Sequence, residues 1–161
     1  MGRATFAAPD GTTFERDVVH HPGAVGVVPV VDEGSAVLLV RQYRSSVDSM
    51  LLEIPAGLRD VEGEPPIETA RRELVEEVGM RAGRVERVCE FLNSPGFCDE
   101  VVHVFAAYDL EPCGTDRQGV EEAHMTVEKV ALDDVPSMIA SGAIVDAKTV
   151  IGLTLVRDSL R

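Results

Sequence analysis

The stretch GLRDVEGEPPIETARRELVEEVGM, residues 57–80, contains the signals of one helix and a cluster of charged side chains along it. Pro66 suits the first position of a helix and Gly79 suits the left-handed turn that ends one, so we expect a helix between them. Its apolar positions, at spacings of 3, 4 and 4, are Ile67, Ala70, Leu74 and Val78. The stretch therefore predicts an amphipathic helix that packs one face against a core.

Three acids, Glu73, Glu76 and Glu77, lie together on another flank of this helix. Glu73 and Glu77 are a like-charge pair one turn apart, and all three lie near the helix C-terminus, where the macrodipole favours cations. Each effect costs about a few tenths of a kcal/mol. A divalent cation such as Mg2+ removes both penalties and can also bind substrate phosphates. The cluster predicts a metal site, and the alternative is a solvated acidic face.

The wider pattern resembles the Nudix box, the signature of hydrolases that act on nucleoside diphosphates linked to another group. Gly57 and Glu64 are followed, after seven residues, by RELVEEVGM at 72–80. In one departure, six residues separate Gly57 from Glu64 where the family usually has five. The extra residue lies in the loop 58–63, so it affects the placement of Gly57 more than the helix. The resemblance implies an α+β fold, an α/β/α sandwich around a mixed β-sheet.

Length and charge restrict the class of protein. The chain has 161 residues, 45% of them hydrophobic, which suits a single domain with a core. Its 15 basic and 28 acidic residues give a net charge of −13, which argues against nucleic acid or an anionic membrane as a partner. Three cysteines without CxxC spacing, and the lack of a long apolar run, favour a soluble, cytoplasmic protein with reduced thiols.

Turn and strand signals divide the chain into a hairpin and a main domain. Thr5–Ala8 and Thr12–Val19 flank an Asp-Gly turn, so residues 1–20 are expected to form a hairpin that belongs to the same unit as the Nudix domain at 21–161. Further strands are expected at 24–31, 36–40, 50–55, 83–92, 101–110 and 125–132. Helices are expected from capping acids at 133–134 to about 141, and at 146–160 with Ala147, Val150, Ile151, Leu155 and Leu160 on the core side.

Motifs outside the box resemble the ADP-ribose pyrophosphatase branch of the family. They are HPGAV at 21–25, LVRQYR at 39–44, EIPAG at 53–57 and SPGF at 94–97. Pro95 lies 16 residues beyond Gly79, where this branch typically has a proline, and we place it with Phe97 among the expected substrate-binding residues. The resemblance covers roughly residues 18–156. It implies hydrolysis of the pyrophosphate of ADP-ribose to AMP and ribose 5-phosphate.

Two alternatives stay open. One is a Nudix hydrolase of another nucleoside diphosphate derivative, such as a nucleotide sugar, a reduced nicotinamide dinucleotide or a dinucleoside polyphosphate. The other is a non-catalytic ligand sensor, in which some of the box acids would be expected to be lost. None of those acids is lost here.

The resemblance also gives roles to individual residues. Glu73, Glu76, Glu77 and the carbonyl of Ala56 are expected to bind Mg2+, with Mn2+ as a substitute, and Arg72 is expected to orient the glutamates. The catalytic base of this branch tends to lie on a loop before a late strand. That loop contains Glu121 and Glu122 here, and we prefer Glu122. The alternative is that both are solvated loop acids.

Residues at the end of the strand near position 40 are further candidates for the substrate site. Arg41 and Arg44 leave a buried strand in an acidic protein, so they are obvious phosphate ligands, Arg44 more than Arg41. Glu53 alternates with apolar neighbours, and we expect it on the catalytic side of the sheet. Tyr43 or Phe97 could stack on the base of the nucleotide, with a place in the core as an equal alternative.

The N-terminal hairpin bears on the expected assembly. A two-stranded ribbon at 5–19 is marginal alone, yet it carries Phe6, Phe14, Val18 and Val19. Proteins of this branch are commonly homodimers whose N-terminal strands reach across to the neighbouring subunit. We therefore expect a symmetric homodimer that takes a small-molecule nucleotide, with neither nucleic acid nor membrane as a partner.

Overall fold

The structure is a computed structural model that describes residues 1–114 and 124–161. Its strands are β1 (Gly2–Ala7), β2 (Thr13–Val18), β3 (Ala24–Val31), β4 (Ala36–Arg44), β5 (Ser49–Glu53), β6 (Ala56–Leu58), β7 (Met80–Leu92), β8 (Val101–Pro112) and β9 (Thr126–Ala131). Its helices are α1 (Pro66–Glu73), which continues as a π-helical turn (Leu74–Val78), α2 (Val135–Ala140) and α3 (Ala147–Ser159). Short 3-10 turns lie at Asp32–Gly34 and Ser45–Val47. Within the described residues, no helix combines the length and apolarity that a membrane span requires.

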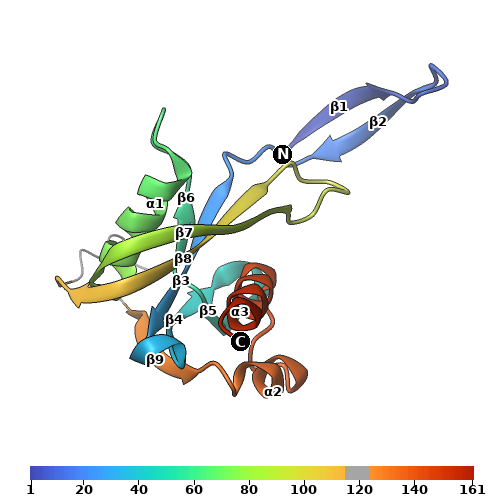
Figure 1. The fold of residues 1–161 in the computed structure, drawn as a ribbon. Coiled ribbons are helices and arrows are strands. Elements are labelled where there is room, and N and C mark those ends of the chain that lie inside the picture. Colours follow the sequence, from blue (N-terminus) through green and yellow to red (C-terminus); the bar gives the residue numbers. More distant parts are fainter. Residues whose placement is uncertain (115–123) are drawn as a thin grey trace.

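A mixed seven-stranded sheet forms the centre of the molecule (Figure 1). Its main order is β5-β4-β3-β8-β7, with β6 paired to β3 and β9 paired to β4. Among the described pairs, β3 with β8 is parallel and the other pairs are antiparallel. Strand β4 runs on to Arg44, beyond the predicted end at Val40, because it pairs with both β5 and β9.

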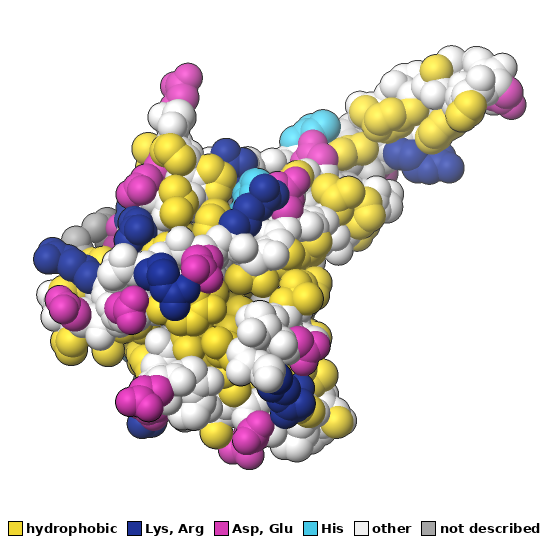
Figure 2. Space-filling view, viewed as in Figure 1, with side chains coloured by type: hydrophobic (Ala, Val, Ile, Leu, Met, Phe, Trp, Pro, Cys, Tyr) yellow, Lys and Arg dark blue, Asp and Glu magenta, His cyan; other side chains and the backbone are white. Residues whose placement is uncertain are grey.

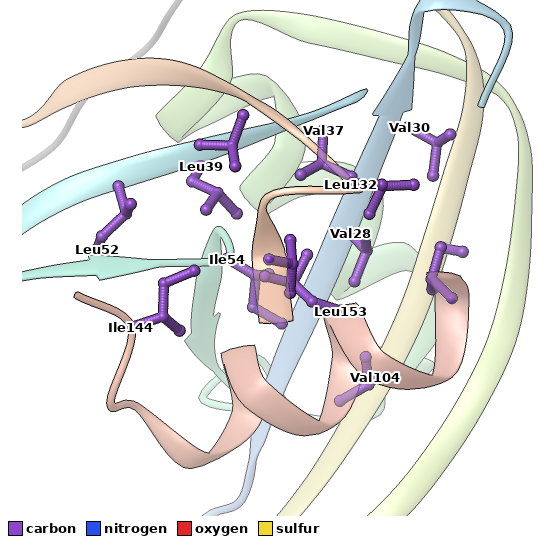
Figure 3. Close-up of a cluster of buried hydrophobic side chains, with 14 of the residues drawn as sticks. Val28, Val30, Val37, Leu39, Leu52, Ile54, Val104, Leu132, Ile144 and Leu153 are labelled. Atoms are coloured by element: carbon purple, nitrogen blue, oxygen red, sulfur yellow. The ribbon is translucent and has the colours of Figure 1, made fainter. Parts of the chain in front are cut away.

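The central strand β3 has core on both faces, as its continuous apolar run indicates. Val27 faces one cluster of buried side chains, together with Leu74 from the helical region that follows the box loop. Val28 faces the other cluster, which includes Leu153 of α3 (Figure 3). The helical segments therefore cover opposite faces of the sheet, and the predicted α+β sandwich is confirmed.

The helix predicted from residues 57–80 is present, with Pro66 as its first residue. Its last turn is a π-helix that ends at Gly79, whose φ of 73° is left-handed. Pro66 is pre-shaped for a helix start, and glycine accepts this left-handed conformation without a steric penalty. Local chemistry thus fixes both ends of the segment that carries the acids.

The predicted core face of the last helix is wrong. On α3 the predicted core positions Ala147, Leu155 and Leu160 are exposed, while the buried positions are Thr149, Gly152, Leu153 and Val156. A Cβ on Gly152 would lie 3.2 Å from side-chain atoms of both Val28 and Val104, so this glycine lets the helix approach the sheet closely and sets which face is buried. At α2, the N-cap is the acid Asp134, as predicted, but its side chain makes no capping hydrogen bond, because its backbone is already helical.

Strands β1 and β2 form a hairpin that projects from the body (Figure 1). Phe6 and Phe14 stack across it with ring centroids 5.8 Å apart. At its base, Val19 forms a parallel bridge with Cys98, and Val19 N–H donates to the Phe97 carbonyl at 2.8 Å. The hairpin is therefore attached to the loop that follows β7, while most of its own surface stays open.

Candidate functional site

One guanidinium lies among the carboxylates of the helix. Arg72 Nη1 is 2.8 Å from Glu73 Oε1 and 3.1 Å from Glu76 Oε2, and Arg72 Nη2 is 3.5 Å from Glu64 Oε2. Thr69 holds Glu64 by donating its hydroxyl to Oε2 at 2.7 Å. Burial alone would lower the pKa of Arg72, but the neighbouring carboxylates raise it above its usual value. Arg72 therefore stays charged, and its single positive charge faces three negative ones.

Two of the glutamates are buried beneath the corner that joins β5 to β6. Glu73 is 6% exposed and Glu77 is 3% exposed. A Cβ on Gly57 would lie 1.9 Å from Glu73 Oε1, so a larger residue at position 57 would displace this carboxylate. The N–H of Ala56 donates to Glu77 Oε2 at 2.9 Å. The structure thus links Ala56 to a box glutamate through its amide, and the metal-binding role of its carbonyl stays a prediction.

The donor set suits a hard divalent cation. Carboxylate oxygens are the ligands that Mg2+ prefers, and the charges of Glu64, Glu73 and Glu76 exceed that of Arg72. In the described parts of the chain, no group of three or more His, Cys, Asp or Glu side chains is already arranged as a ligand set. Glu73 and Glu76 point toward Arg72 instead. The chemistry of these residues fits a metal ion, and the assignment of individual ligands stays a prediction.

A cleft of about 570 Å³ opens beside this acidic cluster. Its walls come from β3 to β6, the segment between β7 and β8, the start of β8, and the first turn of α3. Its lining residues include Arg44, Glu53, Ala56, Gly57, Asp146 and Lys148. Ala56 and Gly57 contact the box glutamates on one side and line the cleft on the other. The cleft therefore adjoins the box glutamates through Ala56 and Gly57, and its lining includes Arg44 and Lys148.

Two cations share one buried carboxylate in this cleft. Arg44 donates from Nε and Nη2 to the two oxygens of Glu53, each at 2.8 Å, and Lys148 Nζ forms an ion pair with Glu53 Oε2. Burial would raise the pKa of Glu53, but Arg44 and Lys148 outweigh it and hold the pKa below its usual value. The hydrogen bonds from Arg44 to Glu53 raise the pKa of Arg44. Arg44 and Glu53 are therefore both ionised at neutral pH. Asp146 Oδ1 also lies 3.0 Å from Lys148 Nζ, so two basic and two acidic side chains meet here.

Lys148 is a cleft residue that the sequence analysis did not single out. It is one of two lysines in the chain, and it lies in the first turn of a helix whose N-cap is Asp146. That scarcity of lysine in an acidic protein is the one signal that could have marked it. His21 also lines the cleft, with its Nδ1 3.5 Å from Glu100 Oε1.

Arg41 lies apart from Arg44, although the two were predicted as a pair of phosphate ligands. Its Nε is 2.5 Å from Glu128 Oε1 and its Nη2 is 3.0 Å from Glu128 Oε2. This hydrogen-bonded partner raises the pKa of Arg41. Arg41 is not among the cleft-lining residues, because the two arginines are separated by three positions on one strand and Arg41 faces β9. Its role toward phosphate stays a prediction.

The remaining predicted residues fall in other places. Pro95 and Phe97 line a second, largely apolar cavity of about 420 Å³, together with Phe6 and Phe14 of the hairpin. Tyr43 is 40% exposed, and its hydroxyl donates to Asp48 Oδ1 at 2.7 Å. The two candidate bases, at positions 121 and 122, lie outside the described residues. The structure therefore places Arg44 and Ala56 in one cleft and Phe97 near the hairpin, while Arg41 and Tyr43 lie outside both cavities.

Comparisons with known proteins agree with this geometry. The family profile described as NUDIX domain matches residues 20–150. The chain is 41% identical over 141 residues to a protein of Bacillus subtilis (strain 168) named ADP-ribose pyrophosphatase, covering 88% of this chain and 75% of the relative. It is 39% identical over 156 residues to a Mycobacterium tuberculosis protein of the same name, covering 97% of this chain and 75% of the relative. A crystal structure described as an ADP compounds hydrolase superimposes with a TM-score of 0.79 at 26% identity, covering 99% of this chain and 92% of the other.

Proposed function

Because the chain belongs to the NUDIX domain family, we propose that it hydrolyses the pyrophosphate bond of ADP-ribose to give AMP and ribose 5-phosphate. The names of the relatives from Bacillus subtilis and Mycobacterium tuberculosis support this substrate. The observation that carries the proposal is the cleft, in which Arg44 and Lys148 share a wall with Ala56 and Gly57, the residues in contact with the box glutamates.

The acidic cluster supplies the metal-binding half of this site. Glu73, Glu76 and Glu77, with the carbonyl of Ala56, are the residues that would hold Mg2+, or Mn2+ in its place. When bound, such an ion polarises the phosphate oxygens and stabilises the charge that grows on them. Arg72 keeps the carboxylates together through charge-assisted hydrogen bonds before the ion arrives.

The cleft supplies the substrate-binding half. Arg44 binds a phosphate oxygen, since its two bonds to Glu53 fix the plane of the guanidinium and leave Nη1 for the substrate. Glu122, or its neighbour Glu121, accepts the proton of the attacking water. Positive charge near the phosphates is needed here because the protein as a whole carries a net charge of −13.

In this proposal the protein works as a symmetric homodimer, with residues 1–20 at the interface and no nucleic acid or membrane partner. Support comes from the apolar cavity between the hairpin and the 93–99 loop. Figure 2 shows hydrophobic side chains along the hairpin and at its base. Phe6, Phe14, Leu92 and Phe97 are 41%, 38%, 55% and 59% exposed. A second copy of the chain is the occupant that would cover this surface.

The free cysteines Cys89, Cys98 and Cys113 support a reducing compartment such as the cytoplasm.

A substrate panel tests the proposed activity. The protein is incubated with ADP-ribose, GDP-mannose, NADH and diadenosine tetraphosphate in the presence of Mg2+ or Mn2+, and the products are separated by chromatography. We expect AMP and ribose 5-phosphate from ADP-ribose, with kcat/KM at least about tenfold above that for the other compounds. A higher kcat/KM for another compound would transfer the assignment to that substrate. The absence of turnover with every compound would favour a ligand sensor.

A further inference from the structure

A chain of hydrogen bonds joins the first turn of α3 to the corner between β5 and β6. The hydroxyl of Thr149 donates to Asp146 Oδ2 at 2.6 Å and accepts from the N–H of Ile54 at 2.9 Å. Thr149 and Ile54 are both fully buried. Thr149 and Ile54 lie 95 residues apart in the chain. A threonine hydroxyl thus connects the N-cap of α3 to the backbone of the corner between β5 and β6.

This corner bears directly on the acidic cluster. The carbonyl of Pro55 accepts from the N–H of Val27 at 2.9 Å, and the N–H of Ala56 donates to Glu77 Oε2 at 2.9 Å. Residues 54–56 are therefore held by three different elements: α3 through Ile54, β3 through Pro55 and the π-helical turn through Ala56. Loss of the Thr149 bond would leave the buried N–H of Ile54 without this acceptor, which is costly enough to shift the corner.

Asp146 acts on the cleft as well as on the corner. Its Oδ2 receives the Thr149 hydroxyl and the Thr149 N–H, while its Oδ1 lies 3.0 Å from Lys148 Nζ. Lys148 in turn pairs with the buried Glu53, the partner of Arg44. One carboxylate therefore fixes both the lysine in the cleft and, through Thr149, the backbone that contacts Glu77.

We propose that Asp146 and Thr149 are positioning residues, which hold the Ile54–Ala56 corner against Glu77 and Lys148 against Glu53. The inference rests on the proposed metal-dependent hydrolysis. Packing alone does not account for the threonine, since a valine of nearly the same shape would fill its volume. Docking of α3 is already provided by the close approach at Gly152 and by the burial of Leu153. The Thr149 hydroxyl is therefore not needed to dock α3, and we assign to it the role of holding the Ile54–Ala56 corner in place.

The test compares three variants on the same helix. Thr149→Val removes the hydroxyl, Thr149→Ser restores it, and Thr154→Val is the matched control, because Thr154 is exposed and its hydroxyl bonds the Val150 carbonyl of its own helix. Mn2+ affinity is measured by spin-resonance titration without substrate, and kcat and KM for ADP-ribose are measured separately. Loss of an outer partner of a metal site typically costs about 10- to 100-fold in affinity or activity. We expect a loss in that range for Thr149→Val, most of it regained in Thr149→Ser and absent in Thr154→Val.

The outcome is read from ratios to the wild-type protein. Unchanged Mn2+ affinity and kcat in a folded Thr149→Val variant, or an equal loss in Thr154→Val, would overturn the inference. If Thr149→Val does not fold, Asp146→Asn replaces it, since asparagine is also a good N-cap but releases Lys148. We expect its KM for ADP-ribose to rise, and an unchanged KM would equally overturn the inference. Failure of the wild-type protein to hydrolyse ADP-ribose would instead overturn the proposed function, while the Mn2+ titration would still test the positioning role.

Discussion

Gly57 lies directly against the carboxylate of Glu73, so closely that a Cβ on Gly57 would come within 1.9 Å of Oε1 and 2.1 Å of Cδ. Glu73 is buried, so its carboxylate has little room to withdraw. The first glycine of the box therefore leaves room for this carboxylate in the folded protein, even though six residues separate it from Glu64. The absence of a side chain at Gly57 therefore allows the carboxylate of Glu73, a predicted metal ligand, to lie where it does.

Gly57→Ala should displace Glu73 and weaken turnover more than folding. Forcing an extra carbon into a filled site costs about 1–3 kcal/mol, and we expect kcat to fall by at least about tenfold because a metal ligand moves. Thermal unfolding and steady-state kinetics measure the two effects. Gly2→Ala is the matched control, since a Cβ at Gly2 meets nothing within 4 Å. Normal turnover in Gly57→Ala would show that Glu73 does not bind the metal.

Glu77→Gln should abolish most metal-dependent turnover while the fold persists. The amide oxygen of glutamine can still accept from the Ala56 N–H, and the like-charge repulsion with Glu73 is relieved, so the unfolding temperature without metal should stay the same or rise. Glu68→Gln, an exposed position on the same helix, is the control. Near wild-type turnover of Glu77→Gln in Mg2+ would remove this residue from the proposed metal site.

Glu122→Gln should lower kcat by about 10^2- to 10^4-fold, the range for loss of a general base, with Mn2+ affinity little changed. Glu121→Gln is the neighbouring comparison, and kinetics at saturating substrate distinguish the two. A larger effect at Glu121 would move the assignment by one residue. If neither variant is impaired, Glu53 is the next candidate, although its bonds to Arg44 and Lys148 favour a positioning role.

Arg44→Gln should raise KM for ADP-ribose and destabilise the protein at neutral pH, because it leaves the buried Glu53 with Lys148 as its remaining cation. The folded-state pKa of Glu53 lies below its unfolded value, so the stability from this pairing is present above about pH 4.3 and is lost as pH falls through the folded pKa. As pH falls through that range, the free energy of unfolding of Arg44→Gln should decrease less than that of the wild-type protein. Denaturant titrations from pH 7 to 3 measure it, with Arg41→Gln for comparison. An equal rise of KM in Arg41→Gln would contradict the preference for Arg44.

Deletion of residues 1–17 should weaken both dimerisation and substrate binding, since it removes Phe6 and Phe14 from the apolar cavity near Phe97. Light scattering of the full-length and truncated chains gives the oligomeric state, and KM for ADP-ribose gives the binding effect. A milder variant, Phe14→Ser, should shift the dimer equilibrium in the same direction. A full-length chain that is monomeric at micromolar concentration, or a truncated chain with unchanged KM, would refute this assembly.

Local patterns in the sequence were enough to define the acid-bearing helix and the N-terminal hairpin. Pro66, Gly79 and the helical period determine which side chains share a face, because these effects act within a few residues. The apolar run at 24–31 likewise predicted a buried strand, and the confirmed sandwich follows from apolar stripes that need cover on both sides of a sheet. The box acids could be grouped without knowledge of any distant contact.

Tertiary structure alone decided how the rest of the cleft is built. Lys148 meets Glu53, and Thr149 meets Ile54, across 95 residues of sequence, and Arg41 turns to Glu128 while Arg44 lines the cleft. The buried face of α3 was also wrongly predicted. Its apolar residues do not share one face, and the close approach of Gly152 to Val28 and Val104 sets which face is buried. Helical spacing is a property of neighbouring residues, whereas strand order and helix docking arise from packing between segments that the sequence keeps far apart.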